Sequence, residues 1–482
     1  MRISECGMPE HNLVFAVPSR ILYYVSCILH PHTKEVIMKQ QRIALLILVV
    51  MAVCFTACTQ DDMTILSDKI EIAANPNLAE WIPRTACNAV DDEFLVVWTE
   101  QGVRETGGPS LYGIVAQRFS SSGDMIGASF APTGGPIQKI ILLPTPEFNM
   151  FTKEYFIGYT MVGDGFDEYG AICSSTGDSV KQPFVISGQP RSQMHTRLAF
   201  NSNRHEYFVV YNSSESGSPD IKGVIIAEDG TPVSGEIMIN DTPGDQYNPF
   251  IAYNPADDTY LLNWEDFRNV PTWEQNGEIY GALLDSDGNV LVNDIPMIDD
   301  FGTADEGDQR LNEVTYNPDK NQFLVCWTDM APSLDNAGIR GRFITADGKL
   351  AGPIFTMVDG IGPQLFPHAI YVSSRKSYFM MWEDGRNQED PDTAWREFTN
   401  LDIYGKWMSA NGRQFSDEVV FCEDPGVQRY SSISYSEKSE RFLVTWQDIV
   451  DEDLNLGETD DQSGQHVKEA GGNVYAIAYG KP

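Results

Sequence analysis

The chain has 482 residues, of which 42% are hydrophobic and 21% charged, and its formal net charge is −36. This length and composition suit a large folded domain and exclude a disordered chain. Because so negative a molecule repels phosphate backbones, we expect no nucleic-acid partner.

The first features in chain order are targeting signals. Residues 38–42 are a basic start, residues 43–55 are an apolar run too short to span a bilayer, and a Thr-Ala-Cys sequence ends at Cys58. We interpret residues 38–57 as a secretory signal. Residues 1–37 are then an upstream extension, produced by a start assigned too early.

The ending of this signal, small residues before a cysteine, resembles a bacterial lipoprotein signal. The resemblance implies that Cys58 carries the lipid and that residues 58–66 form a lipidated tether. Asp61 and Asp62 resemble the surface-export signals of lipoproteins in the Bacteroides group. We therefore expect a lipid-anchored protein of the outer membrane, at the cell surface, with a periplasm-facing orientation left open. The lipid anchor is its only expected membrane contact.

Four cysteines follow the anchor at wide spacings, namely Cys87, Cys173, Cys326 and Cys422. They show no Cys-x-x-Cys pair and no metal pattern, so we expect buried free thiols, no metal site and no cofactor. The acidic residues between 451 and 461 could bind Ca²⁺, but the order of an EF-hand loop is absent and a solvated loop is the favoured interpretation.

One hydrophobic strand recurs seven times after residue 67, at spacings of 52 to 64 residues. Runs of apolar and aromatic residues bounded by turn formers are typical of strands buried on both faces. The copies are Phe94–Trp98, Tyr155–Tyr159, Tyr207–Tyr211, Tyr260–Trp264, Phe323–Trp327, Tyr378–Trp382 and Phe442–Trp446.

Each copy lies in the same context of four strands. A strand with a polar turn precedes it, and a strand containing a glycine, such as Gly281, follows it. Next come Asp-Gly or Asn-Gly pairs, for which we predict type I′ hairpins, and a fourth strand. The pairs are Asp229-Gly230, Asp287-Gly288, Asp347-Gly348 and Asn411-Gly412.

This repeat predicts an all-β fold: a seven-bladed β-propeller of four-stranded antiparallel blades over residues 67–482. Two β-sandwiches fit badly, because sandwiches show no such internal identity. The seventh repeat stops at its third strand, 473–479, and residues 67–73 at the mature N-terminus can supply the fourth. Pairing the two ends would close the ring and remove an exposed edge.

Two motifs indicate a family. Trp-Glu-Asp-x-Arg stands at 264–268 and 382–386, and Asp/Glu-Ile-Tyr-Gly stands at 278–281 and 402–405. They resemble repeats of bacterial secreted and lipoprotein β-propellers. The resemblance implies the fold but no single ligand. Within the motif, Arg268 and Arg386 share a repeat position, so we expect them to pair with Asp266 and Asp384 and brace their loops.

The loops between second and third strands vary in length, as do those between fourth and first strands, and in a blade both sets emerge on one face. Because variable loops on a rigid scaffold usually carry function, we expect the ligand on this decorated face. Trp273 and Trp395 lie in unique insertions there and could stack on sugar rings.

The first strand of each repeat carries two informative positions. A Gln recurs at 193, 246, 309, 364 and 428, and we expect it to serve the fold. Four residues later the residue type diverges, which either reflects packing or places different side chains around the mouth of a channel. Arg84, Arg197, Glu313 and His368 occupy this position and are candidate ligand-binding residues.

The favoured function is therefore a cell-surface propeller that binds an extracellular glycan or a surface protein. No nucleophile motif or phosphate-binding loop is present. The alternative is a polysaccharide-degrading enzyme. In a lyase a His base would act beside an Arg that neutralises a uronate, and in a glycoside hydrolase Glu313 would pair with another carboxylate.

Overall fold

The computed structural model describes residues 62–74, 78–102, 111–162, 165–269, 277–298, 308–330, 337–388, 398–449, 459–460, 466–467 and 472–482. The chain forms two compact units, Met1–Asp62 and Met63–Pro482. The predicted signal and Cys58 lie outside the described residues. Within the described ranges, no helix is long and apolar enough to cross a membrane.

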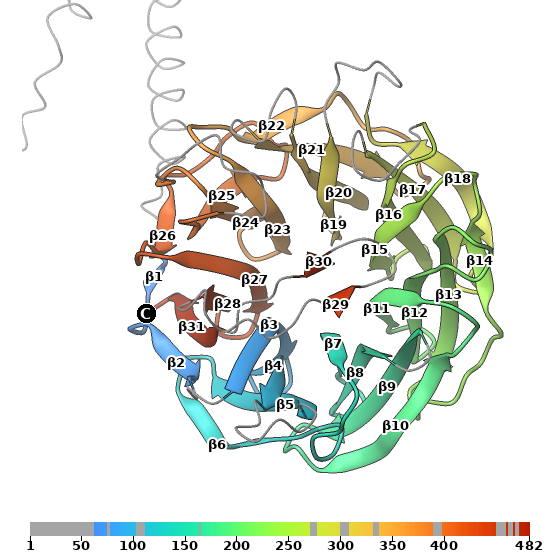
Figure 1. Cartoon of the computed structure of the whole chain (residues 1–482). Helices are drawn as coiled ribbons and strands as arrows, with labels where there is room; N and C mark the ends of the chain where they lie inside the picture. Colours follow the sequence, from blue (N-terminus) through green and yellow to red (C-terminus); the bar gives the residue numbers. More distant parts are fainter. Residues whose placement is uncertain are drawn as a thin grey trace, which may run out of the picture. The chain divides into compact units, whose positions relative to one another are not determined.

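The second unit is a ring of seven antiparallel blades around a central channel, as predicted (Figure 1). Six blades use four strands that follow one another in the chain and pair in that order. Blade 1 holds β3 (Leu78–Asn88), β4 (Glu93–Gly102), β5 (Leu111–Ser120) and β6 (Met125–Phe130); blade 2 holds β7 (Ile141–Asn149), β8 (Glu154–Val162), β9 (Phe166–Ser174) and β10 (Ser179–Ser187); blade 3 holds β11 (Gln193–Asn201), β12 (Glu206–Ser213), β13 (Asp220–Ala227) and β14 (Ile237–Asn240).

The remaining blades continue around the ring. Blade 4 holds β15 (Gln246–Asn254), β16 (Thr259–Asp266), β17 (Glu278–Asp285) and β18 (Val290–Pro296); blade 5 holds β19 (Gln309–Asn317), β20 (Gln322–Asp329), β21 (Gly338–Thr345) and β22 (Phe355–Val358); blade 6 holds β23 (Gln364–Val372), β24 (Ser377–Asp384), β25 (Asp402–Ser409) and β26 (Val419–Cys422). Two short strands, β29 (Thr459–Asp460) and β30 (His466–Val467), pair with each other.

Blade 7 joins the two ends of the propeller, which confirms the predicted closure. Its inner strands are β27 (Val427–Ser436), β28 (Arg441–Ile449) and β31 (Asn473–Gly480). The outer edge of β31 pairs antiparallel with β2 (Ile70–Ala73) and with β1 (Thr64–Ile65). Ile70 lies opposite Ala476 in this register. The last sheet is therefore completed from the N-terminal side of the unit.

The core consists of the second strands, whose recurring apolar run is buried on both faces. Leu95, Val96 and Val97 in blade 1 are fully buried, and so are their equivalents in the other blades. In blades 2 to 6 the glycine of the third strand makes room for this core, whereas blade 7 has Ala476 at that position. A Cβ on Gly405 would lie 2.7 Å from the Phe379 ring, closer than any real contact, so only Gly fits there.

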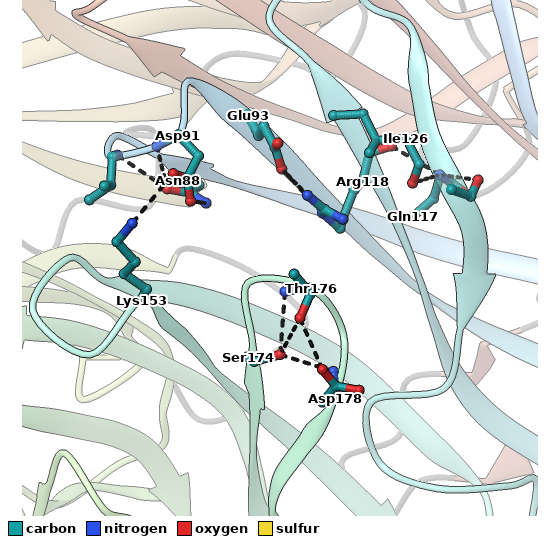
Figure 2. Close-up of polar contacts among 12 residues, drawn as sticks. Asn88, Asp91, Glu93, Gln117, Arg118, Ile126, Lys153, Ser174, Thr176 and Asp178 are labelled. Atoms are coloured by element: carbon teal, nitrogen blue, oxygen red, sulfur yellow. Dashed lines mark hydrogen bonds and ion pairs between the residues drawn. The ribbon is translucent and has the colours of Figure 1, made fainter.

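The turns between first and second strands share one feature in all seven blades, a residue with positive φ directly before the second strand. In blade 1, Asn88 Oδ1 accepts hydrogen bonds from the Val90 and Asp91 amides at 3.1 and 3.0 Å, and Asp92 has φ +61°. Figure 2 shows this turn, with Lys153 of the next blade's turn 3.5 Å from the Asp91 carboxylate. The turns thus link neighbouring blades as well as strands.

The outer hairpins differ from the predicted type I′ turns. At Asp229-Gly230 only the glycine has positive φ, at +75°. The Gly230 amide donates to the Ala227 carbonyl and the Ala227 amide to the Thr231 carbonyl, both at 2.8 Å, which is a three-residue loop ending in a left-handed glycine. The Asp229 carboxylate accepts from the Thr231 amide at 2.8 Å and favours this loop. The Gly at 288, 348 and 412 likewise has positive φ without its predecessor.

Candidate functional site

All seven innermost strands contain a bulge at the same repeat position. The residue two after the recurring Gln position has φ between +48° and +64°, although none of these residues is glycine. Such a conformation costs about 1–3 kcal/mol and persists only where neighbouring groups hold it. The bulged residues are Ile82, Leu143, His195, Asn248, Leu311, Phe366 and Tyr430.

Polar side chains from the preceding blade hold three of these bulges. Glu265 Oε1 accepts the Leu311 amide at 2.9 Å, and Gln447 Oε1 accepts the Ile82 amide at 3.2 Å. Glu383 Oε1 accepts the amide of Ser431, directly after the bulge, at 3.1 Å. Each of the three acceptors follows the tryptophan of a second strand. The second strand of one blade therefore fixes the channel-lining backbone of the next.

The bulges surround a cavity of about 210 Å³ in the channel, lined by residues from all seven innermost strands. Two layers form it. The bulged residues make a mainly apolar layer, in which Phe366 and Tyr430 stand edge to face with ring centroids 6.3 Å apart. Two residues further along each strand, a polar layer contains Arg84, Arg197 and Glu313.

The polar layer also holds His368, whose Nδ1 lies 2.5 Å from Glu313 Oε2 on the neighbouring blade. About 18% of the His368 side chain and 17% of the Glu313 side chain are exposed, so the pair faces the cavity. A carboxylate at Nδ1 fixes the orientation of an imidazole and leaves Nε2 for another partner.

The two arginines bring positive charge into the same layer. Arg84 Nη1 donates to the carbonyls of Pro83 at 3.0 Å and Tyr430 at 3.3 Å. Arg197 lies over the Phe250 ring at 4.4 Å. Burial and the nearby Arg84 lower the pKa of Arg197 to about 9, and burial also lowers the pKa of Arg84. Such shifts mark a polar site that is poorly solvated.

A second histidine of the cavity, His195, is held neutral. Its Nδ1 lies 2.7 Å from Asn212 Oδ1, and burial lowers its pKa to about 4. Because Asn212 Oδ1 can only accept, Nδ1 carries the proton and Nε2 is the free acceptor.

The structure thus brings together four of the six predicted ligand-binding residues: Arg84, Arg197, Glu313 and His368 line one cavity. Trp273 and Trp395 lie outside the described residues. The apolar layer, including Phe366 and Tyr430, was missed by the sequence analysis. The sequence does show a divergent position two residues after each Gln. The left-handed backbone that turns these side chains toward the cavity could not be predicted, because none of the residues is glycine.

The other predicted braces are present. Asp266 and Asp384 each pair with the arginine two residues on, at 2.7 Å, and each accepts the indole N–H of the preceding tryptophan. The recurring Gln is structural, as expected: Gln246 and Gln364 donate to carbonyls of the loop before their strand, and Gln428 donates to Asp448.

The prediction of free thiols agrees with the described residues. Cys173, Cys326 and Cys422 are buried free thiols, and Cys87 is a partly buried one. Among the residues that the structure describes, no group of three or more His, Cys, Asp or Glu is placed to hold a metal ion. The acidic loop around 451–458 lies outside them.

No protein-family model and no curated protein matches the chain. Among solved structures it is similar to a protein of unknown function from Dyadobacter fermentans, at 12% identity and a TM-score of 0.45, covering 87% of this chain and all of that one. It is also similar to the Dos1 propeller, at 11% identity and a TM-score of 0.43, covering 86% of this chain and 95% of that one. A third similar structure is an alpha-L-arabinofuranosidase from Fusarium graminearum, at 13% identity and a TM-score of 0.42. The match covers 86% of this chain and 98% of that one. With TM-scores below 0.5, these likenesses do not bear on what the chain binds.

Proposed function

We propose that the chain is a surface lipoprotein whose propeller binds a glycan in the central cavity. The observation that carries the proposal is the cavity itself, which combines the exposed faces of Phe366 and Tyr430 with the fixed polar groups of Arg84, Arg197 and Glu313. Sugars present apolar C–H faces and hydroxyls, and aromatic rings with charged hydrogen-bonding groups recognise both.

The size of the cavity supports a glycan over a protein ligand. At about 210 Å³ it is smaller than the roughly 300–1,000 Å³ of pockets for drug-sized ligands. It therefore suits one sugar residue at the end of a chain, whereas a protein partner would need a broad surface.

The experiment is a screen of the full chain, purified in detergent, against a glycan panel. We expect binding that Leu311→Trp abolishes, because the larger ring fills the cavity from its apolar layer. Leu350→Trp, an exposed leucine of the same blade, is the matched control. Binding that survives Leu311→Trp, or no binding by the wild type, would contradict the proposal.

The lipid anchor is tested separately. We expect metabolic labelling with a fatty acid to mark the wild-type chain in a bacterial host and not Cys58→Ala. Labelling of both variants would overturn the assignment of Cys58, without affecting the proposed binding.

One observation favours a second candidate function, a polysaccharide-degrading enzyme. Glu313 orients His368 toward a cavity whose polar layer also holds Arg84 and Arg197. This is the arrangement of a general base in a lyase. Release of unsaturated sugar ends by the wild type, lost in His368→Gln with binding retained, would establish it. Binding without turnover would establish the binding protein.

A further inference from the structure

Two of the four arginines that line the cavity, Arg84 and Arg197, belong to its polar layer. Arg84 and Arg197 are partly buried, and within the described residues neither forms an ion pair with a carboxylate. The hydrogen bonds that they make are from Nη1 to backbone carbonyls, Arg197 donating to Thr196 at 2.9 Å. A guanidinium has five N–H donors, so each arginine keeps donors for another partner.

Glu313, the carboxylate of the polar layer, does not form an ion pair with either arginine. Glu313 acts on both arginines at longer range, but its Oε2 contacts His368 at 2.5 Å. Two neighbouring guanidinium groups in a poorly solvated cavity repel each other, and a bound anion would relieve that repulsion. We infer that the ligand is an acidic sugar whose carboxylate is held by Arg84 and Arg197; this inference rests on the proposed glycan-binding function.

The neighbouring side chains fit this ligand class. The Arg197 guanidinium lies 4.4 Å from the centroid of the Phe250 ring, a cation–π contact that helps to hold it in place. A planar fork matches a carboxylate with two parallel hydrogen bonds. Phe366 and Tyr430 offer apolar surface to the sugar ring, and Glu313 and His368 offer acceptors and donors to its hydroxyls.

The net charge of the whole molecule limits how many carboxylates the ligand can carry. A net charge of −36 repels long acidic polymers. Only a ligand that brings one carboxylate into the cavity gains the contact without placing many more against the acidic exterior. The recognised unit is therefore a single hexuronate, at the end of a chain or in a short saccharide.

The test uses calorimetry on the full chain in detergent. The probes are a disaccharide that ends in galacturonate and the same disaccharide with its carboxyl reduced to the alcohol. We expect the acidic form to bind at least tenfold more tightly than the reduced form. A hexose 6-phosphate is the third probe. It should bind more weakly than the acidic disaccharide, because its anionic oxygens lie two bonds further from the sugar ring than those of a uronate carboxylate.

Variants then locate the carboxylate. Arg84→Gln and Arg197→Gln should each weaken binding of the acidic disaccharide by about tenfold to a hundredfold and leave the reduced one unchanged. Arg118→Gln and Arg204→Gln remove the same charge from the same two blades, at arginines paired outside the cavity, and should leave both affinities unchanged. If a cavity variant does not fold, the affinities of the wild type for the acidic and the reduced disaccharides still test the inference.

The outcomes separate the two proposals. Equal binding of the acidic and reduced disaccharides, or equally tight binding of the phosphate, would overturn the acidic-sugar inference and leave glycan binding intact. Binding of no saccharide would overturn the proposed function and the inference with it.

Discussion

Glu168 on β9 has none of its surface exposed, and its partners are the hydroxyls of Thr160 and Thr196. Burial raises the pKa of this carboxyl from 4.5 to about 8. The folded protein therefore keeps a proton that the unfolded chain releases, and the stability that this proton provides is lost as the pH rises from 4.5 to 8.

Glu168→Gln should remove this dependence, because an amide mimics the protonated acid. We expect the stability of the variant relative to wild type to grow by roughly 1.4 kcal/mol per pH unit between pH 5 and 8. Urea unfolding at several pH values measures it, with Glu71→Gln, an exposed glutamate, as control. A difference that stays constant with pH would contradict the account.

The cavity residues show which parts of the site could be predicted from the sequence alone. Arg84, Arg197, Glu313 and His368 could be found because the repeat aligned the first strands, and alignment reveals a position where residue types diverge. The 2.5 Å contact between Glu313 and His368 could not be found, because it joins two blades and depends on how they are spaced around the ring.

The Trp-Glu-Asp-x-Arg and Asp/Glu-Ile-Tyr-Gly motifs meet in space and brace the decorated loops. The Arg386 guanidinium pairs with Asp384 and lies 4.1 Å from the Tyr404 ring centroid, and Arg268 does the same with Asp266 and Tyr280. The two motifs therefore hold the ends of the loops in place, which explains why they indicate the fold and no ligand.

Asp384→Ala should show the strength of this brace. Asp384 is fully buried, and its loss leaves the Trp382 indole N–H without its acceptor and the Arg386 guanidinium with Glu418 as its remaining carboxylate partner. Leaving a buried donor without its acceptor costs about 1–3 kcal/mol. Urea unfolding should show this loss, whereas Asp347→Ala, in an exposed hairpin turn, should change the midpoint little. Equal effects of the two substitutions would refute a buried brace.

The hairpin turns and the bulges mark where sequence patterns were insufficient. Asp-Gly pairs suit both a type I′ turn and the observed loop with a left-handed glycine. The hydrogen bond from the Thr231 amide to Asp229 favours the observed loop, and the residue pair alone does not predict it. The bulges at residues such as Leu311 need an acceptor from another blade, Glu265, so no single repeat encodes them.

Closure of the ring uses the same chemistry as the braces. In blade 7 the aspartate of the motif is Asp448, and no arginine follows it two residues later. Lys69, just before β2, takes that place: its Nζ lies 2.7 Å from Asp448 and 3.9 Å from the Tyr475 ring centroid. The N-terminal strand thus supplies both the missing strand and the missing cation.

A cross-link tests this closure. Ile70 and Ala476 are directly opposite each other and belong to one apolar cluster, so Ile70→Cys with Ala476→Cys should form a disulfide. We expect the oxidised protein to gain about 2–4 kcal/mol of stability. Ile70→Cys alone is the control. Failure of the pair to oxidise would show that β2 does not lie against β31.

The central claim is that the channel cavity is the ligand site, and a crystal structure of the chain with a bound hexuronate tests it most directly. We predict density for one sugar inside the ring, with its carboxylate within hydrogen-bond distance of Arg84 and Arg197. Density for the sugar on the outer face of the blades, with the cavity empty, would contradict the account.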